Sequence, residues 1–176
     1  MKVLLHTCCG PCASACVPRL QEEGLEVTLF YSNSNIDTEA EFERRREAAE
    51  TLARTDGVPL AVDVYDHAAW LREAAAGYES EPEKGARCER CFRFNLARTA
   101  AYAAAHGYDG FATSLTVSPH KVSPVIFAQG EAVGDGRFLR YDFKKKEGFK
   151  LSVRRAAELG LYRQSYCGCE FSKKGC

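Results

Sequence analysis

The stretch Met1-Lys2-Val3-Leu4-Leu5-His6-Thr7-Cys8-Cys9-Gly10-Pro11-Cys12 decides how this chain folds. Its apolar run at residues 3–6 is typical of a buried strand in a parallel sheet. The run leads directly into cysteines, with no signal-peptide core before them, and a helical pattern follows Pro11 up to about Glu23. We therefore expect a strand–helix unit with thiols where the strand ends, exposed by a tight turn at Gly10-Pro11.

The rest of the chain repeats this alternation. Strands are expected at residues 27–31, 60–64, 110–114 and 138–143, and helices at 38–57, 68–76, 88–106, 122–133 and 152–159. Residues 77–87 are polar and read as a surface loop. Alternating strands and helices predict an α/β fold, a single domain over residues 1–176 with a mainly parallel sheet and helices on both faces. Ligands of such sheets bind beyond the carboxyl ends of the strands, where the thiols of this chain should meet.

The composition excludes several classes of protein. Apolar residues make up 45% and charged residues 27% of the 176 residues, which is ordinary for a globular domain. No apolar run approaches the roughly 20 residues of a membrane helix, so we expect a cytoplasmic protein. Nine cysteines stand at positions 8, 9, 12, 16, 88, 91, 167, 169 and 176. In a reducing compartment, grouped thiols of this kind indicate a metal site or thiol redox chemistry.

Charge is unevenly distributed although the formal net charge is zero. Residues 1–136 hold 13 Lys and Arg against 20 Asp and Glu, whereas residues 137–176 hold 11 against 4. The lysine run at 144–146 alone is typical of a solvated surface. The asymmetry of the whole segment favours a partner that carries phosphates.

Two cysteine pairs have the spacing of metal ligands. Cys8 and Cys9 are adjacent, and Cys88 and Cys91 form a C-x-x-C at a helix start, where the helix dipole and the neighbouring arginines should favour thiolate. Four such thiolates suit a [4Fe–4S] cluster or a structural Zn²⁺, and the spacing alone leaves the two nearly balanced. Cys12 is open to three interpretations, an extra ligand, a redox thiol or a structural residue.

Three further cysteines lie outside these pairs. Cys167-Gly168-Cys169 would close a very small disulfide ring, which should be strained and easily reduced, or else the pair ligates a second metal. Cys16 is expected to be a small buried apolar residue, and Cys176 to be incidental.

Polar residues follow the predicted strands at the same edge. Ser118, His120 and Lys121 come after the fourth strand and could hold a phosphate or a base edge, and Asn33 and Asn35 come after the second. The other histidines, His6, His67 and His106, are expected to be structural or at the surface.

These residues together resemble the QueH family of epoxyqueuosine reductases. The matching segments are residues 6–12, 31–36, 87–92, 113–121, 141–145 and 162–169, together with Glu41 and Arg45, in order over nearly the whole chain. The chain departs from the family pattern at Ser34, where proline is expected, at Asp37-Thr38, where His-Pro is expected, and at His120, where tyrosine is expected.

The resemblance implies a Rossmann-like three-layer fold akin to adenine nucleotide alpha-hydrolases, with a cysteine-bearing C-terminal tail. It also implies reduction of epoxyqueuosine to queuosine at the tRNA wobble position, using a [4Fe–4S] cluster with a second iron nearby and an electron donor that the sequence does not identify. The implied cluster ligands are Cys8, Cys9, Cys88 and Cys91. Cys167 and Cys169 would be a redox pair or part of the second site, with Cys12 as a further catalytic candidate and Asp142 as a ligand of the second iron.

The chemistry agrees with these residues, because removing an epoxide oxygen to leave an alkene takes two electrons and two protons. A cluster supplies one electron at a time, so a dithiol or a Lewis-acidic second iron would be useful. Two other classes compete with this interpretation. The first is a structural-zinc tRNA-binding module; the second, an ATP-using tRNA-thiolation enzyme, is disfavoured because no Ser-Gly-Gly-x-Asp-Ser loop follows the first strand.

Overall fold

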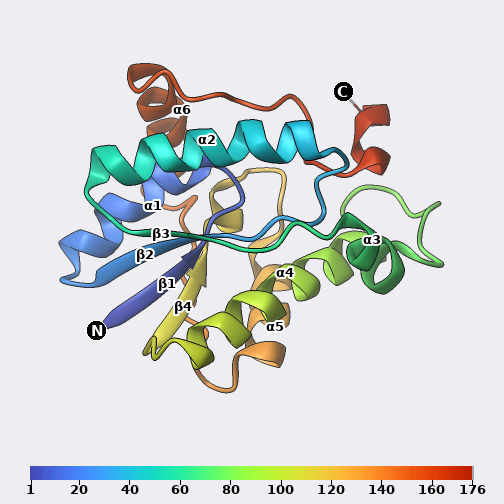
Figure 1. The fold of residues 1–176 in the computed structure, drawn as a ribbon, viewed down its shortest axis with the longest axis horizontal. Helices are drawn as coiled ribbons and strands as arrows, with labels where there is room; N and C mark the ends of the chain where they lie inside the picture. Colours follow the sequence, from blue (N-terminus) through green and yellow to red (C-terminus); the bar gives the residue numbers. More distant parts are fainter. Residues whose placement is uncertain (176) are drawn as a thin grey trace.

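A four-stranded parallel sheet forms the centre of the computed structural model, which describes residues 1–175 (Figure 1). Its strands are β1 (Lys2–His6), β2 (Glu26–Tyr31), β3 (Leu60–Val62) and β4 (Gly110–Thr113), in the order β3-β2-β1-β4. Val3 of β1 stands opposite Val27 of β2 and Gly110 of β4. Since all strands run the same way, their carboxyl ends meet at one edge, as the sequence predicts.

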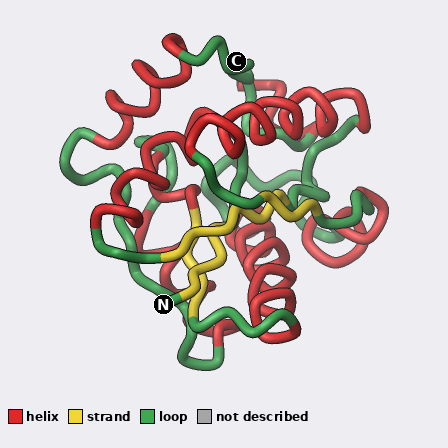
Figure 2. Tube along the Cα trace, turned by 60° about the vertical axis from the view of Figure 1, so that its left-hand side comes forward, coloured by secondary structure: helices red, strands yellow, loops and turns green. Residues whose placement is uncertain are grey.

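Helices cover both faces of the sheet and make it a three-layer sandwich (Figures 1 and 2). One face carries α1 (Gly10–Glu22), α2 (Glu39–Asp56) and α6 (Gly148–Glu158), and the other carries α4 (Ala86–Ala105) and α5 (Ser123–Gly134). Successive side chains of a strand point to opposite faces. Accordingly Leu5 belongs to the core under α1, and Leu4 to the core under α4 and α5.

Short elements complete the chain at the carboxyl edge. The predicted helix at 68–76 is found as α3 (His67–Trp70), which continues as a wider turn, η1 (Leu71–Ala75). Two 3₁₀ turns follow later in the chain, η2 (Ser114–Val117) after β4 and η3 (Glu170–Gly175) in the tail. The loop before α4 carries an unexpected feature, because Arg87, placed by the sequence at the end of a surface loop, is only 2% exposed.

The predicted fifth strand at residues 138–143 is wrong. Only one bridge forms beside β4, where Phe111 N–H donates to Arg137 O and Leu139 N–H donates to Phe111 O, at 3.0 and 2.8 Å. β4 continues to Thr113, but the neighbouring segment turns away from it at residues 139–141, where Tyr141 N–H donates to Leu139 O at 3.0 Å. Instead the Thr116 hydroxyl donates to Tyr141 O and accepts from Phe143 N–H.

Gly10 has a different role from the predicted tight turn. Gly10 and Pro11 form the first turn of α1, with Cys9 as its N-cap. A Cβ on Gly10 would lie 2.7 Å from the carbonyl oxygen of Ala48 in α2, so glycine is needed for the close approach of the two helices. The packing of α2 against α1 therefore fixes where the strand-end cysteines sit.

The predicted start and end of α2 are confirmed. The Thr38 side chain accepts a hydrogen bond from Glu41 N–H, and Gly57 ends the helix with a positive φ of 65°. Among the described residues, no helix is both long enough and apolar enough to cross a membrane. The prediction for Cys176 falls outside the described residues.

Candidate metal and redox site

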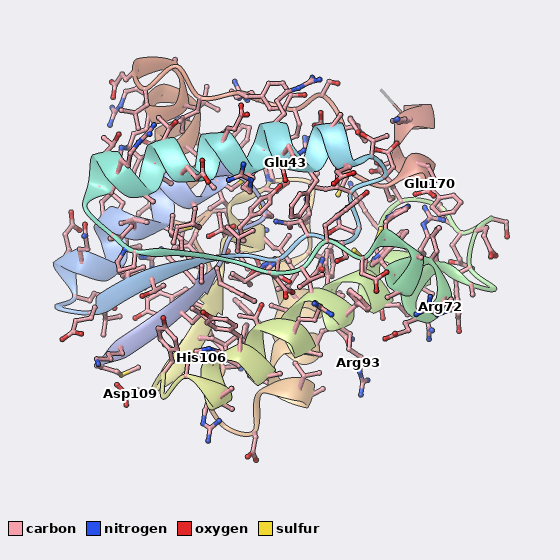
Figure 3. All side chains as sticks on the ribbon, viewed as in Figure 1. Glu43, Arg72, Arg93, His106, Asp109 and Glu170 are labelled. Carbon is pink, nitrogen blue, oxygen red and sulfur yellow. The ribbon has the colours of Figure 1, made fainter. Side chains whose placement is uncertain are left out.

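A cavity of about 470 Å³ opens at the carboxyl edge of the sheet, and cysteines from three parts of the chain line it. They come from the junction of β1 and α1, from the start of α4 and from the tail; they are Cys8, Cys9, Cys12, Cys88, Cys91, Cys167 and Cys169. Figure 3 shows Glu170 of the tail beside α3, far from His106 and Asp109 at the opposite end of the molecule. Because these seven cysteines line one cavity, the fold brings together the thiols that the sequence predicts should meet.

Cys8, Cys9 and Cys12 form the tightest group, with their sulfur atoms all within 4.8 Å of one another. Hydrogen bonds donated by the Cys12 and Cys8 thiols hold the pKa of Cys9 well below its usual value. The pKa of Cys12 is well above its usual value, because its proton is shared with Cys8 and Cys9 and because it is buried. The Ser114 hydroxyl lies 3.3 Å from the Cys8 sulfur and accepts from Cys8 N–H at 3.0 Å.

Cys88 and Cys91 lie in the first turns of α4, facing the same cavity. Burial raises the pKa of Cys88 and raises that of Cys91 well above its usual value, so the predicted preference for thiolate is wrong for the metal-free chain. The positive charge of Arg87 lowers the pKa of Cys88, but less than burial raises it. The guanidinium groups of Arg87 and Arg90 donate to backbone carbonyls of neighbouring segments. Metal binding at this pair would have to displace protons.

Polar hydrogens nevertheless point at these two sulfur atoms. Lys84 N–H donates to the Cys88 sulfur at 3.3 Å, and the Asn95 side-chain amide lies 3.8 Å from the Cys91 sulfur. The same Asn95 amide donates to Asn35 Oδ1 at 3.0 Å, which links α4 to the loop after β2.

The C-x-C segment of the tail is held over the cavity by side chains of α2. Arg45 is 2% exposed; its guanidinium donates to the carbonyl oxygens of Cys167 and Tyr166 at 2.8 and 3.2 Å. It also pairs with the buried Glu41 carboxylate at 2.7 Å, and Glu41 in turn accepts from the Tyr162 hydroxyl. Cys167 is exposed and Cys169 is buried, and both are free thiols.

Contacts from the loop after β2 and from α4 complete the fixing of the tail. Asp37 accepts from the Tyr166 hydroxyl at 2.6 Å and pairs with Lys173 at 2.5 Å. Its backbone N–H donates to the Gly168 carbonyl oxygen. The Arg87 guanidinium lies over the Phe171 ring, 4.7 Å from its centre. The buried Arg87 thus joins the start of α4 to the tail, which explains why it is not at the surface.

The predicted substrate-binding residues line the cavity. Asn33, Asn35 and Ser118 are buried or half-buried there, His120 is exposed, and Lys121 lies among the sulfur atoms. The negative charge available on Cys167 and on the strand-end cysteines raises the pKa of the Lys121 amine above its usual value. Asn33 is partly engaged by the fold, since its amide donates to Thr7 O at 2.8 Å.

Asp142 is the predicted site residue that the structure does not place in the cavity. Its carboxylate accepts from the Ser123 hydroxyl at 2.9 Å, and its carbonyl oxygen accepts from Arg19. Cys16 is buried in the core and donates to Cys12 O, and His6 is buried between Thr113 and Ser32, as predicted for both.

Sequence reasoning missed several residues of this site. Asn95 lies four residues after Cys91 on one helix face, so helical spacing could have found it. Ser114 follows β4 directly, so the strand-end rule could have found it too. Trp70 carried no such signal, yet it lines the cavity and packs against Cys91 and Cys169.

The donor set suits a metal centre. The described cysteines are free thiols, with N–H and O–H groups directed at several of their sulfur atoms. The buried Trp70 indole N–H is also directed at a cavity sulfur, since its hydrogen bond lowers the pKa of the Cys91 thiol. Hydrogen bonds to the sulfur ligands are one of the means by which proteins tune an iron–sulfur group, so the residues present fit such a group.

Comparisons with known proteins agree with the resemblance seen in the sequence. A solved structure, described as a predicted subunit of tRNA methyltransferase from Methanocaldococcus jannaschii, matches 87% of this chain and 74% of its own, with a TM-score of 0.58 and 16% identity. This likeness concerns the fold alone, and it confirms the predicted Rossmann-like α/β class.

Relatives at higher identity share one description. An epoxyqueuosine reductase QueH from Streptococcus pyogenes is 36% identical over 98% of this chain and 70% of its own length. Another, from Dehalococcoides mccartyi, is 34% identical over 98% of this chain and 92% of its own. The family model described as epoxyqueuosine reductase QueH matches residues 3–175. The chain therefore belongs to the epoxyqueuosine reductase QueH family.

Proposed function

We propose that this protein reduces epoxyqueuosine to queuosine at the wobble position of tRNA. The observation that carries the proposal is the convergence of cysteines from three parts of the chain on one cavity, in a member of this family. In the reaction two C–O bonds of the epoxide break and a C=C bond forms. Two electrons and two protons are consumed, and the oxygen leaves as water.

Cys8, Cys9, Cys88 and Cys91 are the proposed ligands of a [4Fe–4S] cluster. Cys8 and Cys9 bring a sulfur pair 3.9 Å apart, and Cys88 and Cys91 bring the second pair from the facing helix. When bound, such a cluster supplies electrons one at a time. The two cysteine pairs that would hold it come from the end of β1 and the start of α4.

Cys167 and Cys169 provide the rest of the redox chemistry in one of two ways. As a dithiol they would give up two electrons and two protons on forming a disulfide, which an external electron donor then reduces. As metal ligands they would hold a second iron, with Cys12 beside the cavity as a further ligand or thiol. Asp142 is left out of this proposal because its carboxylate bonds Ser123 outside the cavity.

Lys121 is the proposed electrostatic partner of the departing oxygen. Its amine lies in the cavity and keeps its proton at neutral pH, because the surrounding sulfur groups raise its pKa. A fixed positive charge beside an oxygen that gains negative charge lowers the barrier to C–O cleavage. Ser118 and His120, nearer the surface, offer hydrogen bonds to the substrate nucleoside.

Metal content and turnover of anaerobically purified protein test the proposal together. We expect about four irons and four sulfides, absorption at about 400 nm, and conversion of epoxyqueuosine in tRNA. Iron beyond four that disappears in a Cys167→Ser/Cys169→Ser variant would assign the tail to a second metal. Unchanged iron with lost turnover would assign it to a dithiol. Stoichiometric zinc without sulfide would contradict the proposal.

A further inference from the structure

The mouth of the cavity carries an exposed aromatic side chain. Phe149 and Val122 line the same cavity as the cysteines, yet they are 39% and 49% exposed, whereas Cys9 is 1% exposed. They therefore lie where the cavity opens to solvent. The reaction proposed above assigns no role to either residue.

The backbone before Phe149 keeps this ring out of the core. Lys146 and Glu147 both have left-handed φ values, 57° and 60°, which residues with a side chain adopt reluctantly. Gly148 follows, and a Cβ there would lie 1.7 Å from the carbonyl oxygen of Phe143, so the position accepts glycine alone. This turn starts α6 with Phe149 in its first turn, exposed at the cavity mouth.

Positive charge surrounds this opening. Lys145 and Lys146 are exposed, and neither forms an ion pair with any described residue. Lys144 donates from Nζ to the carbonyl oxygen of Lys121, which ties the lysine run to the cavity. Arg163 lines the cavity and is exposed. Two carboxylates oppose this charge: Glu147, which is paired with Lys150, and the exposed Glu83, which lines the cavity.

We propose that Phe149 is a stacking platform for a nucleobase of the anticodon loop beside the base under reaction, with Lys145, Lys146 and Arg163 neutralising nearby phosphates. The inference rests on the proposed function, in which tRNA is the substrate. An exposed aromatic ring among cations is how proteins hold unpaired bases, since the ring stacks on a base while the cations follow the backbone. The chemical fit is to single-stranded RNA at the cavity mouth.

Binding of a fluorescent anticodon stem-loop hairpin, with guanine at the wobble position, tests this without turnover. Metal-loaded full-length Phe149→Ala should bind at least about fivefold more weakly than wild type, since one base stack of this kind is worth about 1–3 kcal/mol. Phe149→Trp should restore binding. Val62→Ala is the matched control, because Val62 is 44% exposed and does not line the cavity. Circular dichroism checks that each variant is folded.

The salt dependence separates the ring from the lysines. Lys145→Ala/Lys146→Ala should flatten the plot of log affinity against log salt by about 0.7 for each lost phosphate contact, whereas Phe149→Ala should leave the slope unchanged. The inference is overturned if wild type does not bind the hairpin, or if Phe149→Ala binds it within twofold of wild type. It is also overturned if Phe149→Ala slows turnover only with a protein electron donor, which would make the mouth a donor-docking site. If the hairpin binds as expected but wild type does not reduce epoxyqueuosine, the proposed function fails and this inference stands.

Discussion

The two ends of the chain bring sulfur to one cavity by different means. The strand-end thiols, Cys8, Cys9 and Cys12, are held by the main chain, between a central strand and the first turn of α1. The tail thiols, Cys167 and Cys169, lie outside the sheet and helices that form the two cores, and side chains of distant elements hold them in place.

The strand-end thiols and the tail thiols should therefore be displaced by different substitutions. Moving the strand-end thiols requires disrupting β1, which pairs with strands on both sides. Moving the tail thiols requires the loss of a few hydrogen bonds and ion pairs, together with the packing of Cys169 against Trp70. A rigid group suits cluster ligands, and a separable group suits thiols that must meet an electron donor or open for substrate. Substitutions that release only the tail should increase alkylation of Cys167 and Cys169 and leave the strand-end thiols unchanged.

Arg45→Met should have the largest effect. It leaves the buried Glu41 carboxylate without its guanidinium partner and frees two tail carbonyls. Breaking a buried pair from one side costs about 3–5 kcal/mol in free energy of unfolding. We expect alkylation of Cys167 and Cys169 to accelerate at least about tenfold, while sulfide content stays at the wild-type value.

Arg46→Met is the control for this prediction. Arg46 is the next residue of α2, pairs with Glu43 and Glu50 at the surface, and touches no part of the tail. Its loss should change the free energy of unfolding by about 1 kcal/mol or less. Mass spectrometry of alkylated peptides and urea unfolding measure both quantities. Equal alkylation in Arg45→Met and wild type would mean that Arg45 does not hold the tail.

Asp37→Asn should have an intermediate effect. Burial alone would raise the pKa of Asp37, but hydrogen bonds from Lys173 and Tyr166 outweigh it and hold the pKa below its usual value. A lowered pKa in the folded state means that the carboxylate stabilises the docked tail above the unfolded pKa of about 3.9. That contribution is lost only as pH falls through the lower, folded value. Asp37 therefore stays ionised between pH 5 and 8. The alkylation rate of the tail thiols, divided by the fraction present as thiolate, should be constant over this range.

Lys173→Met separates the two partners of Asp37. Lys173 is 49% exposed, so its ion pair contributes little, about 0–1 kcal/mol. Asp37→Asn removes that ion pair and also weakens the bond from Tyr166. We expect a severalfold rise in tail alkylation for Asp37→Asn and a smaller one for Lys173→Met. The reverse order would show that the surface ion pair, and not the Tyr166 bond, holds this side of the tail.

Local pattern explains why the strand-end region could be predicted from the sequence and the tail contacts could not. An apolar run followed by cysteines places Cys8 and Cys9 at the carboxyl edge of a parallel sheet, whatever the details of packing. The partners of Arg45, by contrast, lie 121 and 122 residues further along the chain. No periodic pattern links residues so far apart in the chain. From the sequence, Arg45 therefore cannot be told from the other charged residues of the polar helix α2.

Two of the wrong predictions, the fifth strand and the thiolate preference of Cys88 and Cys91, have the same physical origin. Residues 138–143 have the composition of a strand, but after one bridge to β4 the chain turns, and the Thr116 side chain takes up the backbone groups of Tyr141 and Phe143. The expected thiolate preference of Cys88 and Cys91 considered the helix dipole and the charge of neighbouring arginines. Burial outweighs both, and burial depends on the tertiary packing of α4.

Tyr162→Phe should have the smallest effect on the tail, and it tests the role of Arg45 more closely. The Tyr162 hydroxyl donates to both Glu41 oxygens at 3.1 Å, while its ring lies under the Arg44 guanidinium. Phenylalanine keeps the ring contact and removes one hydrogen bond to a carboxylate that still has Arg45. We expect a loss of about 1 kcal/mol in free energy of unfolding and unchanged alkylation of Cys167. The contrary outcome is that Tyr162→Phe releases the tail as strongly as Arg45→Met. That result would show that the tail depends on the hydrogen bond from Tyr162 to Glu41, and not on the bonds from the Arg45 guanidinium to the tail carbonyls.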